Sequence, residues 1–310
     1  TEGSVIYSDG SAIAYINNSI LNNNSATKNG GAIYNGTNSI MNIYNSSKFD
    51  SNTAGNEGGA IYNIGGMNLY GAITITNNSA GQNGGAIYSS GSLYFNNGSY
   101  YSSYGDVTIS NNTATKGSGG AIYATGYSSL HGSTFKMEEN TAKNSGGAIY
   151  TSDNLAISSS SLYINDNTSS TGSGGAIYAT GDVYLGSSGD MEITHNTANT
   201  SGGAIYVGDS LSLDFGNLNI SNNTSKQQGG AIYNTNGISF SGTTASIKDN
   251  ITLLEGGAIY NNGNSIQLNS KSLTFSGNYG SAGGAIYNKG NISWANGTNK
   301  VNNESNFTNN

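Results

Sequence analysis

Residues 193–206, ITHNTANTSGGAIY, contain two motifs that return along the whole chain: Ile-x-x-Asn at 193–196 and Gly-Gly-Ala-Ile-Tyr at 202–206. The pentapeptide occurs ten times without a substitution, at intervals of 26 to 28 residues apart from one interval of 35. A degenerate copy at 3–7 lies 27 residues before the first intact one. The intact copies begin at Gly30, Gly58, Gly84, Gly119, Gly146, Gly174, Gly202, Gly229, Gly256 and Gly283. Such self-similarity predicts a stacked repeat architecture, in which no single unit buries its apolar face alone.

Within one period, apolar residues alternate with polar ones in three short bursts, as they do in strands. After Gly174 the bursts are Ile177, then Val183 with Leu185, then Met191 with Ile193. Turn-forming Gly, Asn, Ser or Asp residues bound each burst. We therefore expect an all-β fold, a right-handed parallel β-helix (β-solenoid) of about eleven coils with three strands per coil of about 27 residues. We expect residues 1–310 to form a single β-solenoid repeat domain, cut from a longer array.

An Asn recurs at one register of every period, three residues after an apolar residue, beginning with Ile20 and Asn23. Buried amides at one register can bond to one another and to the turn backbone, which keeps buried polar groups satisfied. We expect this structural ladder to include Asn112, Asn140, Asn167, Asn196, Asn223 and Asn250.

The composition excludes several classes of function. The chain has no Cys, so disulfide scaffolds, Cys-ligated zinc and thiol nucleophiles are excluded. All 10 basic residues are Lys, and the formal net charge is -7. A chain without Arg and with this charge is not expected to bind nucleic acid. No apolar run approaches the ~20 residues of a membrane span, so we expect no membrane insertion of this segment.

The acidic residues are scattered, although β-helices also host polysaccharide-degrading enzymes. Asp153, Asp182 and Asp209 fall near the turn after the tyrosine in three adjacent coils. They are interpreted as turn formers, with a calcium or catalytic cluster as the alternative. The other isolated titratable groups are expected to face solvent: Glu138, Glu139, His131 and His195. We therefore expect no catalytic residue, no metal site, no cofactor and no enzymatic activity.

The joined motifs Gly-Gly-Ala-Ile and Phe/Ile-x-x-Asn resemble the repeats of polymorphic outer-membrane proteins and other type V autotransporter passengers. They are also similar to adhesin-like surface proteins of archaea. The resemblance covers the whole chain and implies a right-handed β-helix that is displayed on a cell surface, at the outer membrane in a bacterium, and acts in adhesion. The chain departs from the chlamydial members in having no Cys.

The tyrosines of the pentapeptides are candidate binding residues. If the preceding Ile points inward, alternation sends Ala and Tyr outward and places the rings in one column. Flat aromatic faces and phenol hydroxyls in such a column can bind glycans or protein. Two alternatives are that the rings only support the packing of adjacent coils, and that an inverted register turns them into core. The candidates on this column are Tyr123, Tyr150, Tyr178, Tyr206 and Tyr233.

The interval of 35 residues comes from an insertion of roughly eight residues between Phe95 and Val107. Its Tyr, Ser, Gly and Asn are typical of adaptable binding loops, and a loop without function is the alternative. The candidate ligand-binding residues of this insertion are Tyr100, Tyr101 and Tyr104. A second, weaker bulge is expected between Trp294 and Phe307.

These features predict an extracellular, surface-displayed adhesin-like passenger that binds glycans or proteins of host cells or neighbouring bacteria. The main alternative is a structural rod or a self-assembling filament, because open strand edges at the ends of a solenoid can associate head to tail. A polysaccharide-degrading enzyme is the least favoured alternative.

Overall fold

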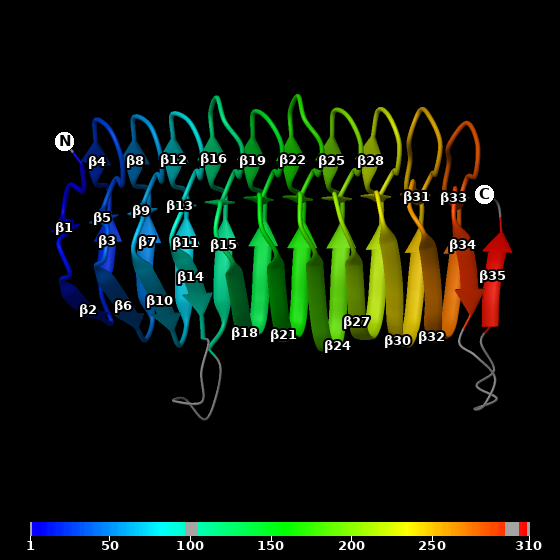
Figure 1. Cartoon of the computed structure of the whole chain (residues 1–310), viewed down its shortest axis with the longest axis horizontal. Helices are drawn as coiled ribbons and strands as arrows, with labels where there is room; N and C mark the ends of the chain where they lie inside the picture. The colour runs from blue at the N-terminus through cyan, green and yellow to red at the C-terminus, as the bar shows by residue number, and fades with distance from the viewer. Residues whose placement is uncertain (1, 97–104, 295–303, 309–310) are drawn as a thin grey trace.

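The computed structural model describes residues 2–96, 105–294 and 304–308, and these residues form strands and turns without any helix. Figure 1 shows the chain wound into coils that stack along a rod, so that each strand lies beside its equivalent in the next coil. The strands pair in parallel and form three sheets that follow the rod axis. The expected parallel β-solenoid is confirmed.

Sheet A consists of the short strands that contain Ile-Tyr of each pentapeptide. Ile aligns with Ile and Tyr with Tyr from coil to coil, as in the pairs Ile149↔Ile177 and Tyr150↔Tyr178. In chain order the strands of sheet A are β1 (Ile6–Ser8), β5 (Ile33–Asn35), β9 (Ile61–Asn63), β13 (Ile87–Ser89), β17 (Ile122–Ala124), β20 (Ile149–Thr151), β23 (Ile177–Ala179), β26 (Ile205–Val207), β29 (Ile232–Asn234), β31 (Ile259–Asn261) and β33 (Ile286–Asn288).

Sheet B contains both the second and the third apolar burst of each coil. In the first four coils the bursts are separate strands, β2 (Ile13–Asn17), β3 (Ile20–Asn22), β6 (Ile40–Tyr44), β7 (Ser47–Asp50), β10 (Gly66–Tyr70), β11 (Ile73–Thr76), β14 (Ser92–Phe95) and β15 (Val107–Ser110). In the next six coils they join into one bent strand, β18 (Ser128–Glu138), β21 (Leu155–Asn165), β24 (Val183–Thr194), β27 (Leu211–Ser221), β30 (Gly237–Lys248) and β32 (Ser265–Ser276). The last strands of sheet B are β34 (Asn291–Trp294) and β35 (Glu304–Thr308).

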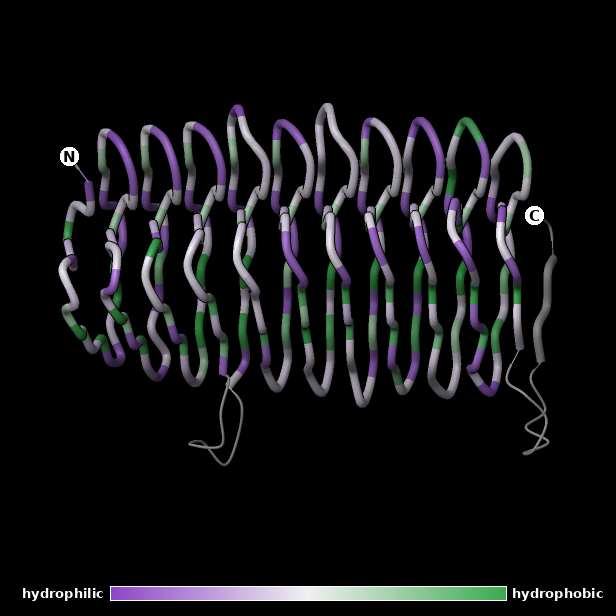
Figure 2. Tube along the Cα trace, viewed as in Figure 1, coloured by the Kyte–Doolittle hydropathy of each residue, from purple (hydrophilic) through white to green (hydrophobic). Residues whose placement is uncertain are grey.

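Sheet C is built from two-residue strands, each of which directly follows a ladder Asn. Strands of two residues are too short to show an alternating pattern in the sequence. Its strands are β4 (Ser25–Ala26), β8 (Thr53–Ala54), β12 (Ser79–Ala80), β16 (Thr113–Ala114), β19 (Thr141–Ala142), β22 (Thr168–Ser169), β25 (Thr197–Ala198) and β28 (Thr224–Ser225). Loops of mainly hydrophilic residues extend beyond this sheet (Figure 2).

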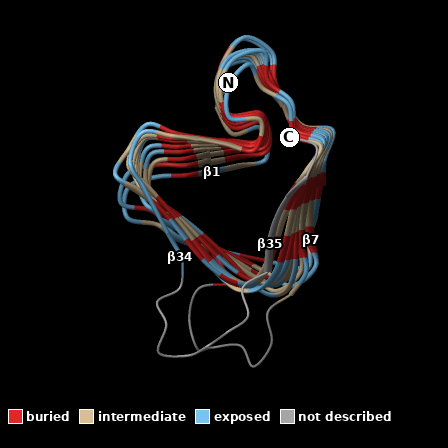
Figure 3. Ribbon diagram, turned by 90° about the vertical axis from the view of Figure 1, so that its right-hand side faces the viewer, coloured by how far each residue is buried: buried red, intermediate tan, exposed pale blue. Residues whose placement is uncertain are grey.

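The solenoid is right-handed, as expected. Figure 3 looks along the rod from its C-terminal end. Each coil runs from sheet A, at β1, through the half of sheet B at β34 to the half at β7 and β35. This path is counterclockwise while the chain advances toward the viewer, which is the right-handed sense that parallel crossovers favour.

The core lies between sheet A and the two halves of sheet B. Ile of the pentapeptide faces inward in the repeats, and Ile149, Ile205 and Ile259 are buried among the inward residues of sheet B. Full burial of one such side chain contributes about 1.5–3 kcal/mol. The stacked coils therefore share one continuous apolar interior along the rod.

The two glycines of each pentapeptide have different structural roles. Gly202 has a φ of 66°, in the left-handed region, and the first glycine of every other intact copy has a similar angle. A Cβ on Gly203 would collide with the carbonyl oxygen of Gly230 and lie 2.7 Å from the backbone of Thr224 in the next coil. The first glycine is thus required by backbone conformation and the second by close approach of two coils.

Two details of the sequence-based expectations are wrong. The Ala of the pentapeptide does not face outward, since Ala148 and Ala204 are fully buried in the core. It precedes the strand in the Gly-Gly turn, where the alternation of a strand does not apply. In the first coil the inward residue is Leu21 and the ladder begins at Asn24, one position later than expected, while Ile20 is exposed.

Candidate binding surface

The outward residues of sheet A form a column of stacked rings that we call the tyrosine ridge. It consists of Tyr7, Tyr34, Tyr62, Tyr88, Tyr123, Tyr150, Tyr178, Tyr206, Tyr233, Tyr260 and Tyr287. Successive ring centroids lie 4.7 to 5.3 Å apart, and the ring planes are within 18° of parallel. The ring of Tyr123, for example, lies 4.7 Å from that of Tyr150 at 3°.

This stacking changes what the ridge offers to a ligand. Each interior ring has another ring on both faces, so the faces are not accessible as the sequence suggested. Tyr150, Tyr178 and Tyr206 remain partly exposed through their edges. Desolvation in the stack, followed by the charges of neighbouring tyrosines, raises the pKa of Tyr62 to about 12. The ridge therefore presents ring edges and phenol hydroxyl groups at the spacing of the coils.

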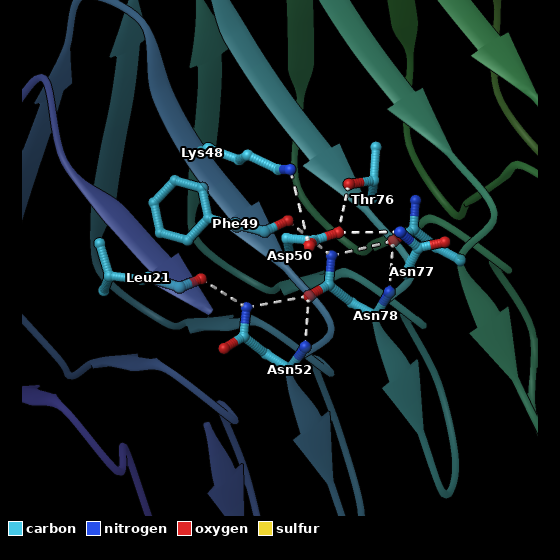
Figure 4. A network of polar contacts seen from close by, with 9 residues as sticks. Leu21, Lys48, Phe49, Asp50, Asn52, Thr76, Asn77 and Asn78 are labelled. Atoms are coloured by element: carbon cyan, nitrogen blue, oxygen red, sulfur yellow. Dashed lines mark hydrogen bonds and ion pairs between the residues drawn. The ribbon is translucent and has the colours of Figure 1, made fainter. Parts of the chain in front are cut away.

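The ladder asparagines lie inside the rod at the end of sheet B. Asn52 and Asn78 are fully or almost fully buried. The Asn52 side-chain Nδ2 donates to Leu21 O at 2.9 Å and to Asn78 Oδ1 at 3.0 Å (Figure 4). Asn78 Oδ1 also accepts the backbone N–H of Asn52 at 2.9 Å. Both amide hydrogens and the amide oxygen are satisfied, so the ladder joins adjacent coils without an unpaired polar group.

The same pattern continues through the six asparagines that the sequence singled out. Each of them is 0% exposed, and each Nδ2 donates to the Oδ1 of the next ladder asparagine at 2.9 to 3.0 Å. They are Asn112, Asn140, Asn167, Asn196, Asn223 and Asn250. Because these groups are buried and saturated, they position coils and do not contact a ligand.

A small polar network on the outer face of sheet B lies beside the ladder. Asp50 Oδ1 accepts hydrogen bonds from Thr76 Oγ1 at 2.7 Å and from Asn77 Nδ2 at 2.8 Å (Figure 4). Lys48 Nζ lies 3.6 Å from Asp50 Oδ2. The hydrogen bonds from Thr76 and Asn77 lower the pKa of Asp50, and Lys48 adds to this effect. The carboxylate thus links two coils.

The three turn aspartates do not form a cluster of carboxylates at one register. The register Leu155↔Val183↔Leu211 aligns Asp153 with Gly181 and Asp209, and places Asp182 one position later. Each Oδ1 atom accepts a hydrogen bond from a neighbouring donor. Asp153 Oδ1 accepts from Asn154 N at 2.7 Å, and Asp182 Oδ1 accepts from Ser210 N at 3.0 Å. Asp209 Oδ1 accepts from Asn236 Nδ2 at 2.7 Å. Across the described residues, no group of three or more His, Asp or Glu could hold a metal ion.

Of the remaining titratable candidates, only Glu138 and Glu139 are adjacent in the sequence. Glu139 and His195 occupy the left-handed turn position directly before a ladder asparagine, each with a φ of 57°. His131 Nε2 lies 2.9 Å from Ser129 Oγ, and burial lowers the pKa of His131. His131 and Glu138 are therefore partly buried and not fully solvent-facing.

The insertion tyrosines lie outside the described residues, which exclude 97–104. Tyr100, Tyr101 and Tyr104 therefore remain candidates from composition alone. Most of the second expected bulge, 295–303, is also outside the description, and Trp294 beside it is 40% exposed.

Comparison with known families gives a match that follows the coils. The model of the Chlamydia polymorphic membrane protein repeat matches nine segments that together cover more than half of the chain. The matched residues are 18–36, 46–64, 72–90, 106–125, 135–152, 161–180, 190–208, 217–235 and 272–289. The chain belongs to this repeat family. No curated protein and no solved structure matches it.

The polymorphic membrane protein repeat and the β-solenoid together fit a surface autotransporter passenger, and the family implies an outer-membrane or cell-surface location. The description of the family refers to a repeat of membrane proteins and names no enzymatic activity. Within the described residues, no helix has the length and apolarity needed to cross a membrane.

One feature of the outer surface has no counterpart in the sequence-based candidates. A cleft of about 520 Å³ opens where the long strands of sheet B bend, and Tyr184, Asp214 and Ser158 line it. A second cleft of about 390 Å³ adjoins it, and Tyr184 lines this cleft too. At this bend β24 contains one more residue than its neighbours. The 28-residue interval of this coil does not reveal the extra residue, because the preceding interval, from Gly146 to Gly174, has the same length.

Proposed function

We propose that this chain is the adhesive segment of a surface passenger and that it binds glycans or proteins of host cells or neighbouring bacteria. The family and the solenoid support display at a cell surface. The carboxylates of Asp50, Asp153 and Asp182 are engaged in turns and coil contacts, which favours a contact surface over a catalytic site.

The observation that carries the proposal is the tyrosine ridge. It presents a partly exposed phenol on nearly every coil of sheet A, at centroid spacings of 4.7 to 5.3 Å. Tyrosine combines a large apolar contact area with a polar tip, and it is enriched at binding interfaces. Many equivalent weak contacts along a rigid rod also raise the overall avidity for an extended partner.

The experiment compares three variants for attachment to cells, glycan arrays and protein-coated surfaces. Replacing Tyr150, Tyr178 and Tyr206 with Phe keeps the stack and removes the hydroxyls, and we expect weaker attachment at unchanged thermal stability. Replacing the same residues with Ser should weaken attachment and also lower stability, by about 0.2–1 kcal/mol per adjacent pair.

The insertion supplies the third variant. Replacing Tyr100, Tyr101 and Tyr104 with Ser tests whether the insertion contributes, since a binding loop of this composition would lose attachment without a change in thermal unfolding. If all three variants attach as well as the parent, neither surface is adhesive. If the parent instead grows into fibres as its concentration rises, the filament alternative replaces adhesion.

A further inference from the structure

Tyr184 differs from the ridge tyrosines because its ring is not covered by other rings. It lies on the outer face of β24 and is 39% exposed. Its partners in the adjacent strands are Ala156 and Ser212, whose side chains are too small to cover it. None of the described rings stacks on Tyr184. It is therefore an aromatic surface that a ligand can contact.

The position of the ring depends on the glycine two residues later in the strand. A Cβ on Gly186 would lie 2.7 Å from Tyr184 Oη and 2.8 Å from Cε1, so any other residue would displace the phenol. Gly186 pairs with Asp214 of the next coil. Burial and the Asp214 carboxylate raise the pKa of Tyr184, as expected for a phenol held beside a negative charge.

The space beside the ring has the size and chemistry of a small-ligand site. The cleft of about 520 Å³ lies within the range of pockets that hold small molecules. The exposed groups around Tyr184 and Asp214 include Ser160 and Ser188, which offer hydroxyls. The extra residue of β24 at this bend is a β-bulge, a feature that bends a strand and redirects its side chains.

The adjoining cleft continues along the strands on the other side of Tyr184. It contains Tyr127, which is 44% exposed, together with Asn154 and Asp182. Because Tyr184 lines both clefts, an elongated ligand can contact its ring and reach into each of them. Neither set of described lining residues contains a Lys or His, so an anionic ligand would meet carboxylates without a compensating charge.

We infer that Tyr184, Asp214 and the serines of the bend form a binding site for neutral saccharides. The apolar C–H face of a pyranose packs on the Tyr184 ring, and the Asp214 carboxylate accepts hydrogen bonds from sugar hydroxyls. Serine hydroxyls both donate and accept, as sugar hydroxyls do. The inference rests on the proposed adhesive function and names the ligand class of one site on the rod.

The test measures binding of maltose, cellobiose, lactose and chitobiose to the whole chain by calorimetry and by chemical-shift perturbation. We expect at least one of these disaccharides to bind with half-saturation at about 1 mM or below. Tyr184→Ala should weaken this binding about tenfold or more, and Tyr184→Phe clearly less, because Phe keeps the ring. Asp214→Asn should also weaken it. Sialic acid and glucuronic acid should bind more weakly than the neutral sugars.

Tyr163→Ala is the matched control. Tyr163 is partly exposed on β21, outside both clefts, with Lys136 Nζ 5.5 Å from its ring centroid. This variant should bind the disaccharide within about twofold of the parent. Circular dichroism and thermal unfolding of every variant test whether the fold is intact. Tyr184→Gln is a second variant that removes the ring, for use if Tyr184→Ala fails to fold.

The outcomes separate this site from adhesion in general. If no neutral disaccharide binds, or if Tyr184→Ala and Tyr184→Gln bind like the parent, the saccharide site is wrong. Attachment of the same preparation to cells or protein-coated surfaces would then leave the adhesive function standing. Disaccharide binding that depends on Tyr184, without attachment to any cell, would overturn adhesion and keep the site.

Discussion

At the scale of single residues, each pentapeptide uses glycine for two separate reasons. Gly202 has a positive φ, and Gly203 lies against the backbone of the next coil. We expect Gly202→Ala to cost about 1–3 kcal/mol through backbone strain. Gly203→Ala should cost at least as much, because a backbone neighbour cannot move aside as a flexible side chain can. Denaturant unfolding measures both.

Gly237 supplies the control for this comparison. A Cβ at Gly237 would meet its nearest neighbours only at 3.7 Å, and its φ is not in the left-handed region. Gly237→Ala should therefore leave stability unchanged or raise it by up to about 1 kcal/mol. A Gly203→Ala variant as stable as Gly237→Ala would contradict the close-approach role.

The ladder asparagines give a second prediction at this scale. Asn167 Nδ2 donates to Asn196 Oδ1 and to Met137 O, and its Oδ1 accepts the backbone and side-chain N–H groups of Asn140. Asn167→Ala leaves these buried groups unsatisfied in two coils and should cost about 2–4 kcal/mol.

Asn217 is the control for the ladder because it is exposed and makes a single side-chain bond to Asp190. Asn217→Ala should change the free energy of unfolding by less than about 0.5 kcal/mol. Equal effects of the two substitutions would show that the ladder does not stabilise the coils.

At the scale of elements, the tyrosine ridge makes the rod sensitive to alkali. Burial raises the pKa of Tyr62 to about 12, and it also raises the pKa values of Tyr178 and Tyr206, whereas a tyrosine in the unfolded chain titrates near 10.0. The folded state thus holds these protons more tightly than the unfolded state. This contribution to stability is complete below pH 10 and is lost as the pH rises toward about 12.

Thermal unfolding and tyrosinate absorbance measured across that range test this expectation. The midpoint of unfolding should fall between pH 10 and about 12, and phenol ionisation should lag behind that of free tyrosine. A variant with Tyr62→Phe, Tyr178→Phe and Tyr206→Phe should show a shallower fall, since Phe does not ionise. Titration of all tyrosines at the ordinary pKa, without a loss of stability, would contradict a desolvated stack.

The elements also show what the sequence predicts and what it does not. Ile and Tyr of the pentapeptide are consecutive residues of a strand, so the period of a strand predicts that their side chains point in opposite directions. Ala204 sits in the Gly-Gly turn, where that rule does not hold, and it is buried. The tyrosine rings stack because each Tyr pairs with the Tyr of the adjacent coil. Repetition predicts this register but does not tell whether the ring faces stay open.

The cleft at Tyr184 is the part of the surface that the sequence does not reveal. Its openness depends on small neighbours, Ala156 and Ser212, that lie far from Tyr184 in the chain, and on the bulge in β24. Such a site arises from a departure from the repeat. Motif searches follow the repeat itself and therefore pass over it.

At the scale of the whole molecule, the solenoid should tolerate removal of one complete coil. Deletion of residues 229–255 removes 27 residues and joins Gln228 to Gly256, so the pentapeptide register is kept. Since each coil contacts only its neighbours, we expect a folded rod that is one coil shorter. Deletion of 229–242 breaks the register and should give an unfolded or aggregated chain. Equal folding of the two deletions by circular dichroism would contradict the modular solenoid.

We propose that this rod adheres through its outer surface, while its interior only stacks the coils. The most direct test is a concentration series of attachment to cells and glycan arrays, run on the parent and on the rod lacking residues 229–255. We expect saturable attachment of both, with half-saturation within about twofold, because the deletion spares Tyr184, the insertion and most of the ridge. Adhesion through the outer surface is contradicted if the parent shows no saturable attachment and instead lengthens into fibres as its concentration rises.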